Sequence, residues 1–261
     1  IFYREEKGFD HFKVALAIPV QKMIQSLVSG IIFTCDPVTG EKNRVVVEAV
    51  FGLGEMIVQG EATPEHFLID KADFSIIRKI PSVQKIEMIK TNGRTLKVKI
   101  PLARQNKAKL SDKEAVKLAK LAEKIHKHYF FPQDIEFCLD NKRNIFIVQT
   151  RPVTTLKDTK VSNVSEVAEV AKVNKEIEEK KEILSGYGAS PGIGWGPTVL
   201  INSKKEIGRV KKDDVLVTSM TTPDFVPAMK RVSAIVTDKG GLTSHAAIVS
   251  RELGVPCVVG T

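Results

Sequence analysis

Residues 237–256 read TDKGGLTSHAAIVSRELGVP and decide how the C-terminal part of this 261-residue chain folds. The run before the two glycines indicates a strand, the glycines indicate a turn, and the apolar spacing after Ser244 indicates a helix. Such a turn presents backbone N–H groups at the start of a helix, where the helix dipole favours an anion. The stretch therefore predicts a phosphate environment made of Gly240, Gly241, Thr243 and Ser244.

His245 lies in the first turn of that helix and carries a side chain able to act as a nucleophile. The helix N-terminus disfavours a positively charged ring, so it keeps the imidazole neutral and able to attack phosphorus. The dipole also stabilises the charge gained once the ring is phosphorylated. A single histidine at a helix start also commonly caps or packs, and the residues alone leave both interpretations open.

A second polar cluster is expected on a hairpin of residues 134–139 and 145–150, which a polar turn joins. Alternate residues of a strand share a face, so the acidic residues of the first strand point away from its apolar ones. If Asp140 pairs with Ile145, cross-strand neighbours gather two carboxylates, an amide and a guanidinium. These are Asp134, Glu136, Gln149 and Arg151. A structural salt bridge would use the same arrangement, so this interpretation also stays open.

Short β-branched runs separated by turn signals indicate that the first 150 residues are rich in strands. The expected strands are Val14–Val20, Gly30–Thr34, Arg44–Ala49, His66–Ile69, Ser75–Ile80 and Arg94–Ile100. One helix is expected among them, because Ser111 and Glu114 form a capping box before apolar residues that recur at helical spacing up to about His128.

The domain organisation follows from a shift in composition. Residues 154–185 are rich in Lys, Glu, Val and Ala, which indicates a helical linker between domains. After it, expected strands alternate with expected helices, an α/β pattern. The strands are 214–218, 234–237 and 257–259, and the helices are 223–230 and 244–253. We therefore expect one domain over residues 1–153 and a second over residues 186–261.

Composition excludes several classes of protein. A hydrophobic share of 43% and a charged share of 27% are close to globular averages, which excludes a disordered or collagen-like chain. The apolar runs fall short of the roughly 18 residues that a membrane-spanning helix needs. Cys35, Cys138 and Cys257 are far apart, which disfavours a disulfide framework and a zinc site. We expect a cytoplasmic protein with no membrane partner.

The formal net charge of +9 is local rather than general. Residues 71–130 hold 16 Lys and Arg against 5 Asp and Glu, a balance of +11, so the rest of the chain is close to −2. The lysines fall mostly on alternate strand positions or on one helix face, which is typical of a solvated surface. A polyanion site is the alternative, although no aromatic and basic motif for nucleic acid accompanies it.

The residues quoted at the outset resemble the phosphohistidine ("swivelling") domain of the PEP-utilising enzymes. That family carries the motif Gly-Gly-x-Thr-Ser/Cys-His-Ala-Ala followed by Arg-Glu-Leu-Gly-x-Pro. The matching residues are Gly240, Gly241, Thr243, Ser244, His245, Ala246, Ala247, Arg251, Glu252, Leu253, Gly254 and Pro256. By this resemblance His245 is the phosphoryl carrier.

The upstream part of the chain resembles the nucleotide domain of the same enzymes, which has an ATP-grasp fold. The similar stretches are 29–34, 36–37, 52–55, 59–60, 134–137 and 149–152. The resemblance implies an α+β and α/β multidomain chain: the C-terminal portion of an ATP-grasp domain, then a truncated swivelling β/β/α phosphohistidine domain. It also gives the hairpin cluster a role in holding ATP phosphates and Mg²⁺. Nucleotide-binding residues are then Asp134, Glu136, Gln149, Arg151 and Glu55, with Glu136 and Gln149 as metal ligands and Glu48 as a weaker candidate.

In this family, ATP phosphorylates the histidine, and the histidine domain then swings to a further domain to phosphorylate pyruvate. The run GLGEMIVQG at residues 52–60 favours the branch in which water takes the second phosphoryl group. Branches that use phosphate or an antibiotic stay open, as does a non-catalytic basic module that binds polyanions. We expect ATP and pyruvate as substrates, with no nucleic-acid partner and possible homo-oligomers of the full-length protein.

The chain starts at Ile1 rather than Met. We therefore expect a fragment. The family's remaining nucleotide-binding residues would precede Ile1 and its pyruvate site would follow Thr261, so the piece alone is expected to make no phosphoenolpyruvate.

Overall fold

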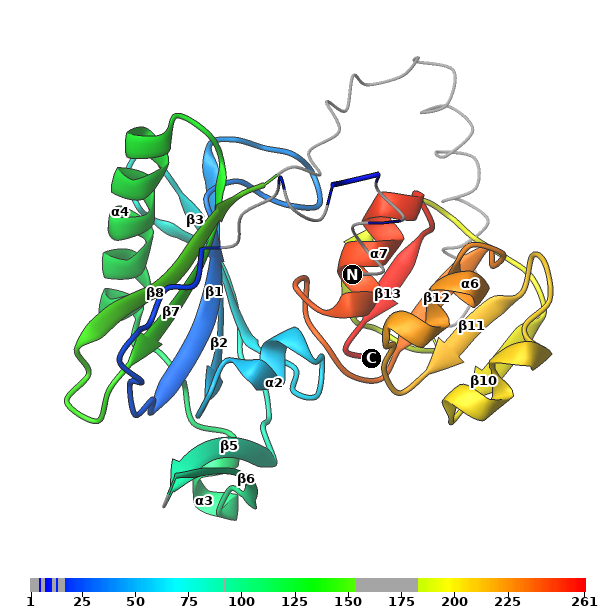
Figure 1. The fold of residues 1–261 in the computed structure, drawn as a ribbon, viewed down its shortest axis with the longest axis horizontal. Helices are drawn as coiled ribbons and strands as arrows, with labels where there is room; N and C mark the ends of the chain where they lie inside the picture. Colours follow the sequence, from blue (N-terminus) through cyan, green and yellow to red (C-terminus); the bar gives the residue numbers. More distant parts are fainter. Residues whose placement is uncertain (1–4, 6–7, 11–12, 14–16, 92, 154–182) are drawn as a thin grey trace.

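The computed structural model of the chain contains two main sheets, one in each half of the sequence (Figure 1). It describes all residues except 1–4, 6–7, 11–12, 14–16, 92 and 154–182. We call residues 28–153 the N-terminal part and residues 186–261 the C-terminal part. No helix in the described residues is long and apolar enough to cross a membrane.

The N-terminal part is built on a six-stranded sheet in the order β4-β3-β2-β1-β7-β8, in which every neighbouring pair is antiparallel. Its strands are β1 (Val28–Phe33), β2 (Arg44–Phe51), β3 (Glu65–Asp70), β4 (Ile76–Ile80), β7 (Gln133–Leu139) and β8 (Ile145–Pro152). Both faces of the central strands are buried, so these strands are apolar at nearly every position rather than at alternate ones.

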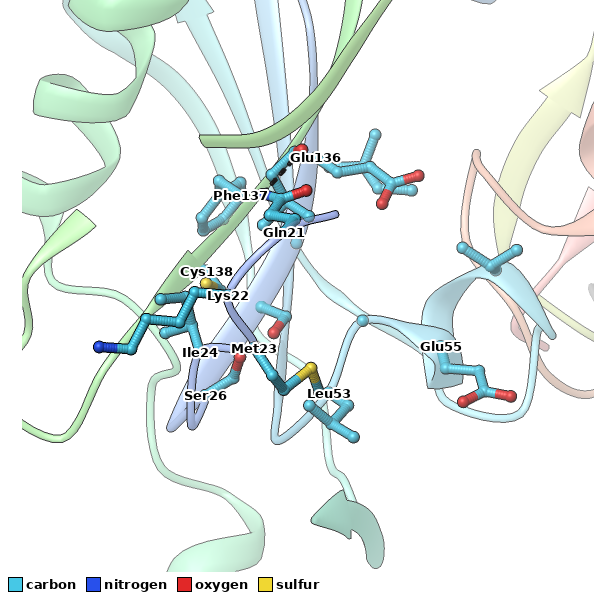
Figure 2. Close-up of a pocket in the computed structure, with 16 residues that line it drawn as sticks. Gln21, Lys22, Met23, Ile24, Ser26, Leu53, Glu55, Glu136, Phe137 and Cys138 are labelled. Atoms are coloured by element: carbon cyan, nitrogen blue, oxygen red, sulfur yellow. Dashed lines mark hydrogen bonds between the residues drawn. The ribbon is translucent and has the colours of Figure 1, made fainter. Parts of the chain in front are cut away.

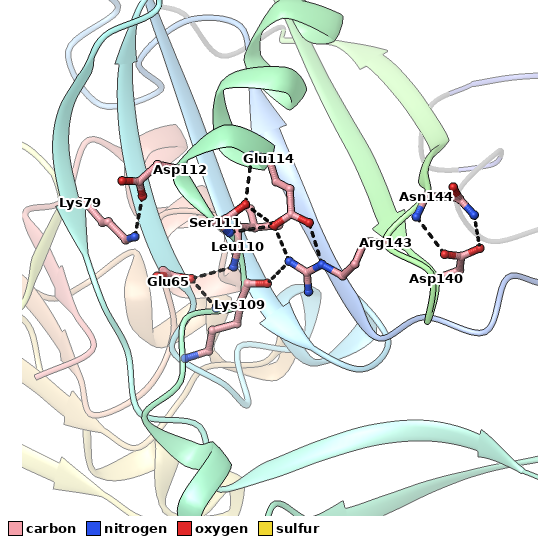
Figure 3. Close-up of polar contacts among 10 residues, drawn as sticks. All are labelled: Glu65, Lys79, Lys109, Leu110, Ser111, Asp112, Glu114, Asp140, Arg143 and Asn144. Atoms are coloured by element: carbon pink, nitrogen blue, oxygen red, sulfur yellow. Dashed lines mark hydrogen bonds and ion pairs between the residues drawn. The ribbon is translucent and has the colours of Figure 1, made fainter.

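Helix α4 (Asp112–Tyr129) covers one face of this sheet (Figure 1). Ser111 and Glu114 form the expected capping box, and the buried residues of the helix recur at three- and four-residue spacing. Arg143, in the β7–β8 turn, makes a two-pronged ion pair with Glu114 and donates to the Lys109 carbonyl oxygen (Figure 3). The helix start is thereby tied to the hairpin that carries the polar cluster.

Smaller elements extend the N-terminal part. Helix α2 (Glu55–Val58) follows the Gly52–Gly54 turn, and a separate hairpin of β5 (Ile86–Thr91) and β6 (Arg94–Lys99) precedes α3 (Leu102–Gln105). The sequence predicted a strand at β6 but not at β5, whose mixed polar and apolar residues lack a strict alternation.

The C-terminal part has a five-stranded sheet in the order β10-β11-β12-β13-β9, of which the first four strands are parallel and β9 is antiparallel. Its elements are β9 (Tyr187–Ser190), β10 (Thr198–Ile201), η1 (Lys204–Arg209), β11 (Val215–Thr218), η2 (Pro223–Phe225), α6 (Val226–Met229), β12 (Ala234–Thr237), α7 (His245–Leu253) and β13 (Cys257–Val259). The predicted alternation of strands and helices is confirmed.

The second face of the six-stranded sheet packs against the C-terminal part. Alternate residues of β2 divide between two cores: Val45, Val47 and Ala49 lie in the core under α4, and Val46 and Val50 in another. This second core also holds Leu242, Ala246 and Ala247 of the C-terminal part. The mixed α/β class that we expected is therefore confirmed, with its sheets packed through an apolar interface.

Two local predictions were wrong. The strand expected over Val14–Val20 lies partly outside the described residues, and its remainder, residues 17–20, has no regular structure. Val20 is fully exposed, and Pro19 has no N–H to donate to a sheet. The expected pairing of Asp140 with Ile145 is also wrong, because Leu139 pairs with Ile145. The predicted linker falls almost entirely in residues 154–182, outside the described residues.

Candidate functional site

His245 is in the first turn of α7, as the sequence predicted, and the structure shows that Ser244 before it is the N-cap. Its ring is half-buried, and its Nδ1 atom shares a 2.8 Å hydrogen bond with Oγ1 of Thr221. Burial lowers the pKa of His245 below its ordinary value, which Glu252 opposes more weakly. The lowered pKa favours the neutral form of the ring at neutral pH.

The hydrogen bond to Thr221 governs which ring nitrogen is nucleophilic. When the Nδ1 proton is donated to the threonine hydroxyl, the lone pair lies on Nε2, which is the atom left to attack an electrophile. Thr221 is itself buried in the loop after β11, so its oxygen is held in place. Sequence reasoning gave Thr221 no role at the site, because it lies 24 positions from the histidine and no local pattern connects the two residues.

The residues of the predicted phosphate environment surround the start of α7, and the hydroxyl groups of Thr243 and Ser244 already have protein partners. Ser244 Oγ accepts from the Ala247 N–H and donates to the Gly241 carbonyl oxygen. The Thr243 hydroxyl donates to Glu48 at 2.8 Å. Gly240 has φ +109°, a conformation that L side chains rarely adopt, which explains a glycine there. A role for these residues toward phosphate stays a prediction.

The hairpin cluster forms with the cross-strand neighbours that the sequence predicted. Asp134 pairs with Arg151, and Glu136 pairs with Gln149. At the turn end of the hairpin Leu139 pairs with Ile145, and a bulge between Glu136 and Phe137 shifts the register by one residue between the two regions. Arg151 Nε donates to Asp134 Oδ2 at 2.8 Å.

Electrostatics make this cluster receptive to a cation. Burial raises the pKa of Asp134 even though Arg151 lowers it, and burial together with the Asp134 charge raises the pKa of Glu136. Asp134 Oδ1 is buried and has no hydrogen-bond partner. Two carboxylates on one face, one with an unused buried oxygen, fit a hard cation, and Gln149 offers a further amide oxygen. Among the described residues, no three His, Cys, Asp or Glu side chains are placed to hold one metal ion together, so the remaining ligands of such an ion would be water or phosphate oxygens.

A pocket of about 400 Å³ opens beside Glu136 of this cluster. Figure 2 shows the residues that line it. Apolar residues from several segments line most of it, including Met23, Ile24, Leu53 and Val148. Charged groups are fewer: Lys22, Glu55 and Glu136. Mostly apolar walls with a few charged groups suit a flat ring carrying a charged tail. Asp134, Gln149 and Arg151 are not among the lining residues.

Sequence reasoning missed the segment 21–24, which supplies four residues of the pocket wall. It belongs to no helix or strand, and its residues carry no recognisable motif. The only available signal was its place directly before β1, where a loop can run along the sheet.

Helix α2 connects the pocket to His245. Glu55, its first residue, lines the pocket, and Gly60, just beyond its end, lies against Ser244: a Cβ placed on Gly60 would be 3.4 Å from the serine Cβ. The start of α7 therefore lies one short helix away from the pocket. A half-buried histidine, a cation-receptive cluster and a pocket are thus assembled from segments far apart in the sequence.

Comparison with known proteins identifies the family. Residues 1–172 match the family described as pyruvate phosphate dikinase, AMP/ATP-binding domain. The chain belongs to this family. Residues 210–261 match a second family, described as PEP-utilising enzyme, mobile domain, and the described part of that match contains His245 and its Thr221 partner.

Curated relatives of this dikinase-family chain include proteins named phosphoenolpyruvate synthase. The chain is 47% identical to the phosphoenolpyruvate synthase of Pyrococcus furiosus, over 100% of this chain and 32% of that protein. It is also 47% identical to a probable phosphoenolpyruvate synthase of Pyrococcus horikoshii, over 100% of this chain and 31% of that protein. It is 50% identical to a probable phosphoenolpyruvate synthase of Archaeoglobus fulgidus over 100% of this chain and 34% of that protein. The chain thus spans about a third of the length of the relatives it matches.

Proposed function

We propose that this chain is the ATP-grasp and phosphohistidine portion of a phosphoenolpyruvate synthase. The full reaction would convert ATP, pyruvate and water to AMP, phosphoenolpyruvate and phosphate through a phosphorylated His245. The names of the curated relatives support this assignment, as do the two family matches. The pyruvate site would lie outside these 261 residues.

The observation that carries the proposal is the state of His245. Burial lowers the pKa of its ring, its Nδ1 is engaged by Thr221, and it starts a helix whose N-cap residue lies against Gly60, just beyond the end of α2. The helix does not need His245 as a cap, because Ser244 already fills that role.

In the first half-reaction, the Nε2 lone pair attacks a phosphorus atom of ATP. An N–P bond forms, a P–O bond of ATP breaks, and the bond's electron pair leaves with the departing phosphate oxygen. The positive charge that develops on the ring is shared with Thr221, whose oxygen accepts the Nδ1 proton in a hydrogen bond. The helix dipole favours the negative phosphoryl group at the same position.

The pocket and the hairpin cluster would position ATP for this attack. The apolar wall near Met23 and Leu53 would take the base, and Glu136 with Gln149, aided by Asp134, would hold Mg²⁺. When bound, Mg²⁺ would neutralise charge on the phosphates. Arg151 is more than half exposed and would turn its guanidinium to phosphate oxygens while staying close to Asp134.

The test is labelling of His245 by ATP. The chain is incubated with Mg²⁺ and either γ- or β-labelled ATP, alone and fused behind the preceding segment of the Pyrococcus furiosus relative. We expect acid-labile, alkali-stable label on the fused protein, and none on a His245→Ala variant with the same circular dichroism spectrum. The position of the label identifies the phosphate that is transferred. A folded fusion that binds ATP and stays unlabelled would rule out the carrier role.

A further inference from the structure

Glu48 lies on the face of β2 that packs against the C-terminal part, and it does not line the nucleotide pocket. Its side chain is 0% exposed. Oε1 accepts the Leu242 N–H at 2.8 Å, and Oε2 accepts the Thr243 hydroxyl at 2.8 Å. Both carboxylate oxygens thus take donors from the turn that leads to His245, and both donors come from the other part of the molecule.

Arg251 also holds this turn. Its guanidinium, in the last turn of α7, donates to the Leu242 carbonyl oxygen at 2.8 Å and to the Ala189 carbonyl oxygen at 3.0 Å. The backbone of Leu242 is therefore held between a cation of its own part and the carboxylate of Glu48. The two charges reinforce each other, because the carboxylate of Glu48 accepts the Leu242 N–H and the guanidinium of Arg251 donates to the Leu242 carbonyl oxygen.

The surroundings of Glu48 make its contacts selective. Val46 and Val50, its neighbours on the same face of β2, lie in the apolar core that the two parts share. A carboxylate in such an interface loses its water, so it is tolerated only where donors replace that water. When the two parts separate, water can solvate the carboxylate again. Glu48 therefore favours one docked arrangement and still permits separation, whereas an apolar residue would favour many arrangements.

The turn also fits closely in steric terms. A Cβ on Gly241 would lie 2.5 Å from Cγ of Pro64 and 2.8 Å from Oε1 of Glu48. The close approach of the turn to β2 and β3 brings the N–H of Leu242 to the carboxylate.

We propose that Glu48 is a positioning residue that docks the turn before His245 on the N-terminal part and so fixes the approach of the histidine to the nucleotide pocket. The docking contact stands on the geometry, and only its effect on phosphoryl transfer rests on the proposed function.

The first test measures docking without any chemistry. Spin labels on Lys117→Cys and Lys205→Cys, two exposed positions in α4 and η1, report the distance between the parts by pulsed EPR. The three native cysteines are buried, which protects them from labelling. We expect one dominant short distance in the parent protein. Glu48→Gln keeps the volume of the side chain but removes the charge and one acceptor, and should lower the ratio of docked to separated molecules about tenfold.

Glu65→Gln is the matched control. Glu65 is also fully buried and also accepts two hydrogen bonds, but both are on Oε2 and come from the N–H groups of Lys109 and Leu110 of its own part. It should lower thermal stability and leave the docked distance in place. Equal loss of docking in both variants, or none in Glu48→Gln, would overturn the proposal.

A double-mutant cycle tests the direct contact. Thr243→Val removes one donor to Glu48. It should reduce docking in the parent protein and have little further effect in the Glu48→Gln background; additive effects would contradict a direct contact.

Labelling of His245 then links docking to transfer. In the fused protein, Glu48→Gln should lower the rate of labelling at saturating ATP about tenfold with the ATP dissociation constant unchanged. A parent protein that docks but is never labelled would refute the proposed function and leave the docking role intact. Normal labelling by a variant that has lost docking would refute the effect on transfer.

Discussion

Gly241→Ala should separate the two parts of the molecule without damaging either one. The structure gives Gly241 no positive φ, so alanine is allowed by the backbone. The new methyl carbon would lie 2.5 Å and 2.8 Å from Cγ and Cδ of Pro64, and both atoms belong to the other part. Overpacking of this kind costs about 1–3 kcal/mol. Since about 1.4 kcal/mol is a factor of ten, the ratio of docked to separated molecules should fall roughly 5- to 150-fold.

The assay is the EPR distance between labels at positions 117 and 205, with thermal unfolding measured in parallel. Gly188→Ala is the control, because a Cβ on Gly188 in β9 meets nothing within 4 Å. We expect Gly241→Ala to shift the distances while Gly188→Ala does not. If Gly241→Ala kept the docked distance, the close approach of this turn to Pro64 would not limit docking, and the reasoning would be refuted.

Three further predictions concern the candidate site and its support. Thr221→Val removes the hydrogen-bond partner of His245 Nδ1 and should slow labelling of the histidine about tenfold, with ATP affinity unchanged. The measurement is the single-turnover rate of labelling, and an unaltered rate would show that Thr221 does not orient the ring. Glu136→Gln should weaken Mg²⁺-dependent ATP binding about tenfold, measured by calorimetry, and should not change binding without Mg²⁺ if the carboxylate acts as a metal ligand. Arg143 lowers the pKa of Glu114 to about 2, so this ion pair should add about 1–2 kcal/mol to the free energy of unfolding above pH 4.5. This contribution should be lost as the pH falls toward 2. Chemical unfolding at several pH values should show the loss in the parent protein and a smaller loss in Glu114→Gln.

The hairpin shows both how far the sequence predicts the site and where the prediction stops. Alternation along two strands identified the neighbours Glu136 and Gln149 correctly. It could not show that Leu139, rather than Asp140, pairs with Ile145, because a bulge shifts the register by one residue in between. A bulge depends on packing across the whole sheet, and no residue in the strand indicates its position.

Glu48 illustrates a different limit. In the sequence it is one acidic residue in an apolar strand, and the resemblance made it a weaker candidate for the nucleotide pocket. Its partners are 194 and 195 positions away, so no local pattern reveals them. Motifs identify residues that share a local structure, whereas a contact between two sheets depends on how the apolar faces of those sheets pack.

Phosphorus NMR of the fused protein after reaction with ATP and Mg²⁺ tests the central claim most directly. The account predicts a phosphohistidine signal from phosphorus bonded to Nε2, present in the parent protein and absent from His245→Ala. A signal from another residue, or a phosphohistidine signal that persists in His245→Ala, would contradict the assignment of His245 as the phosphoryl carrier.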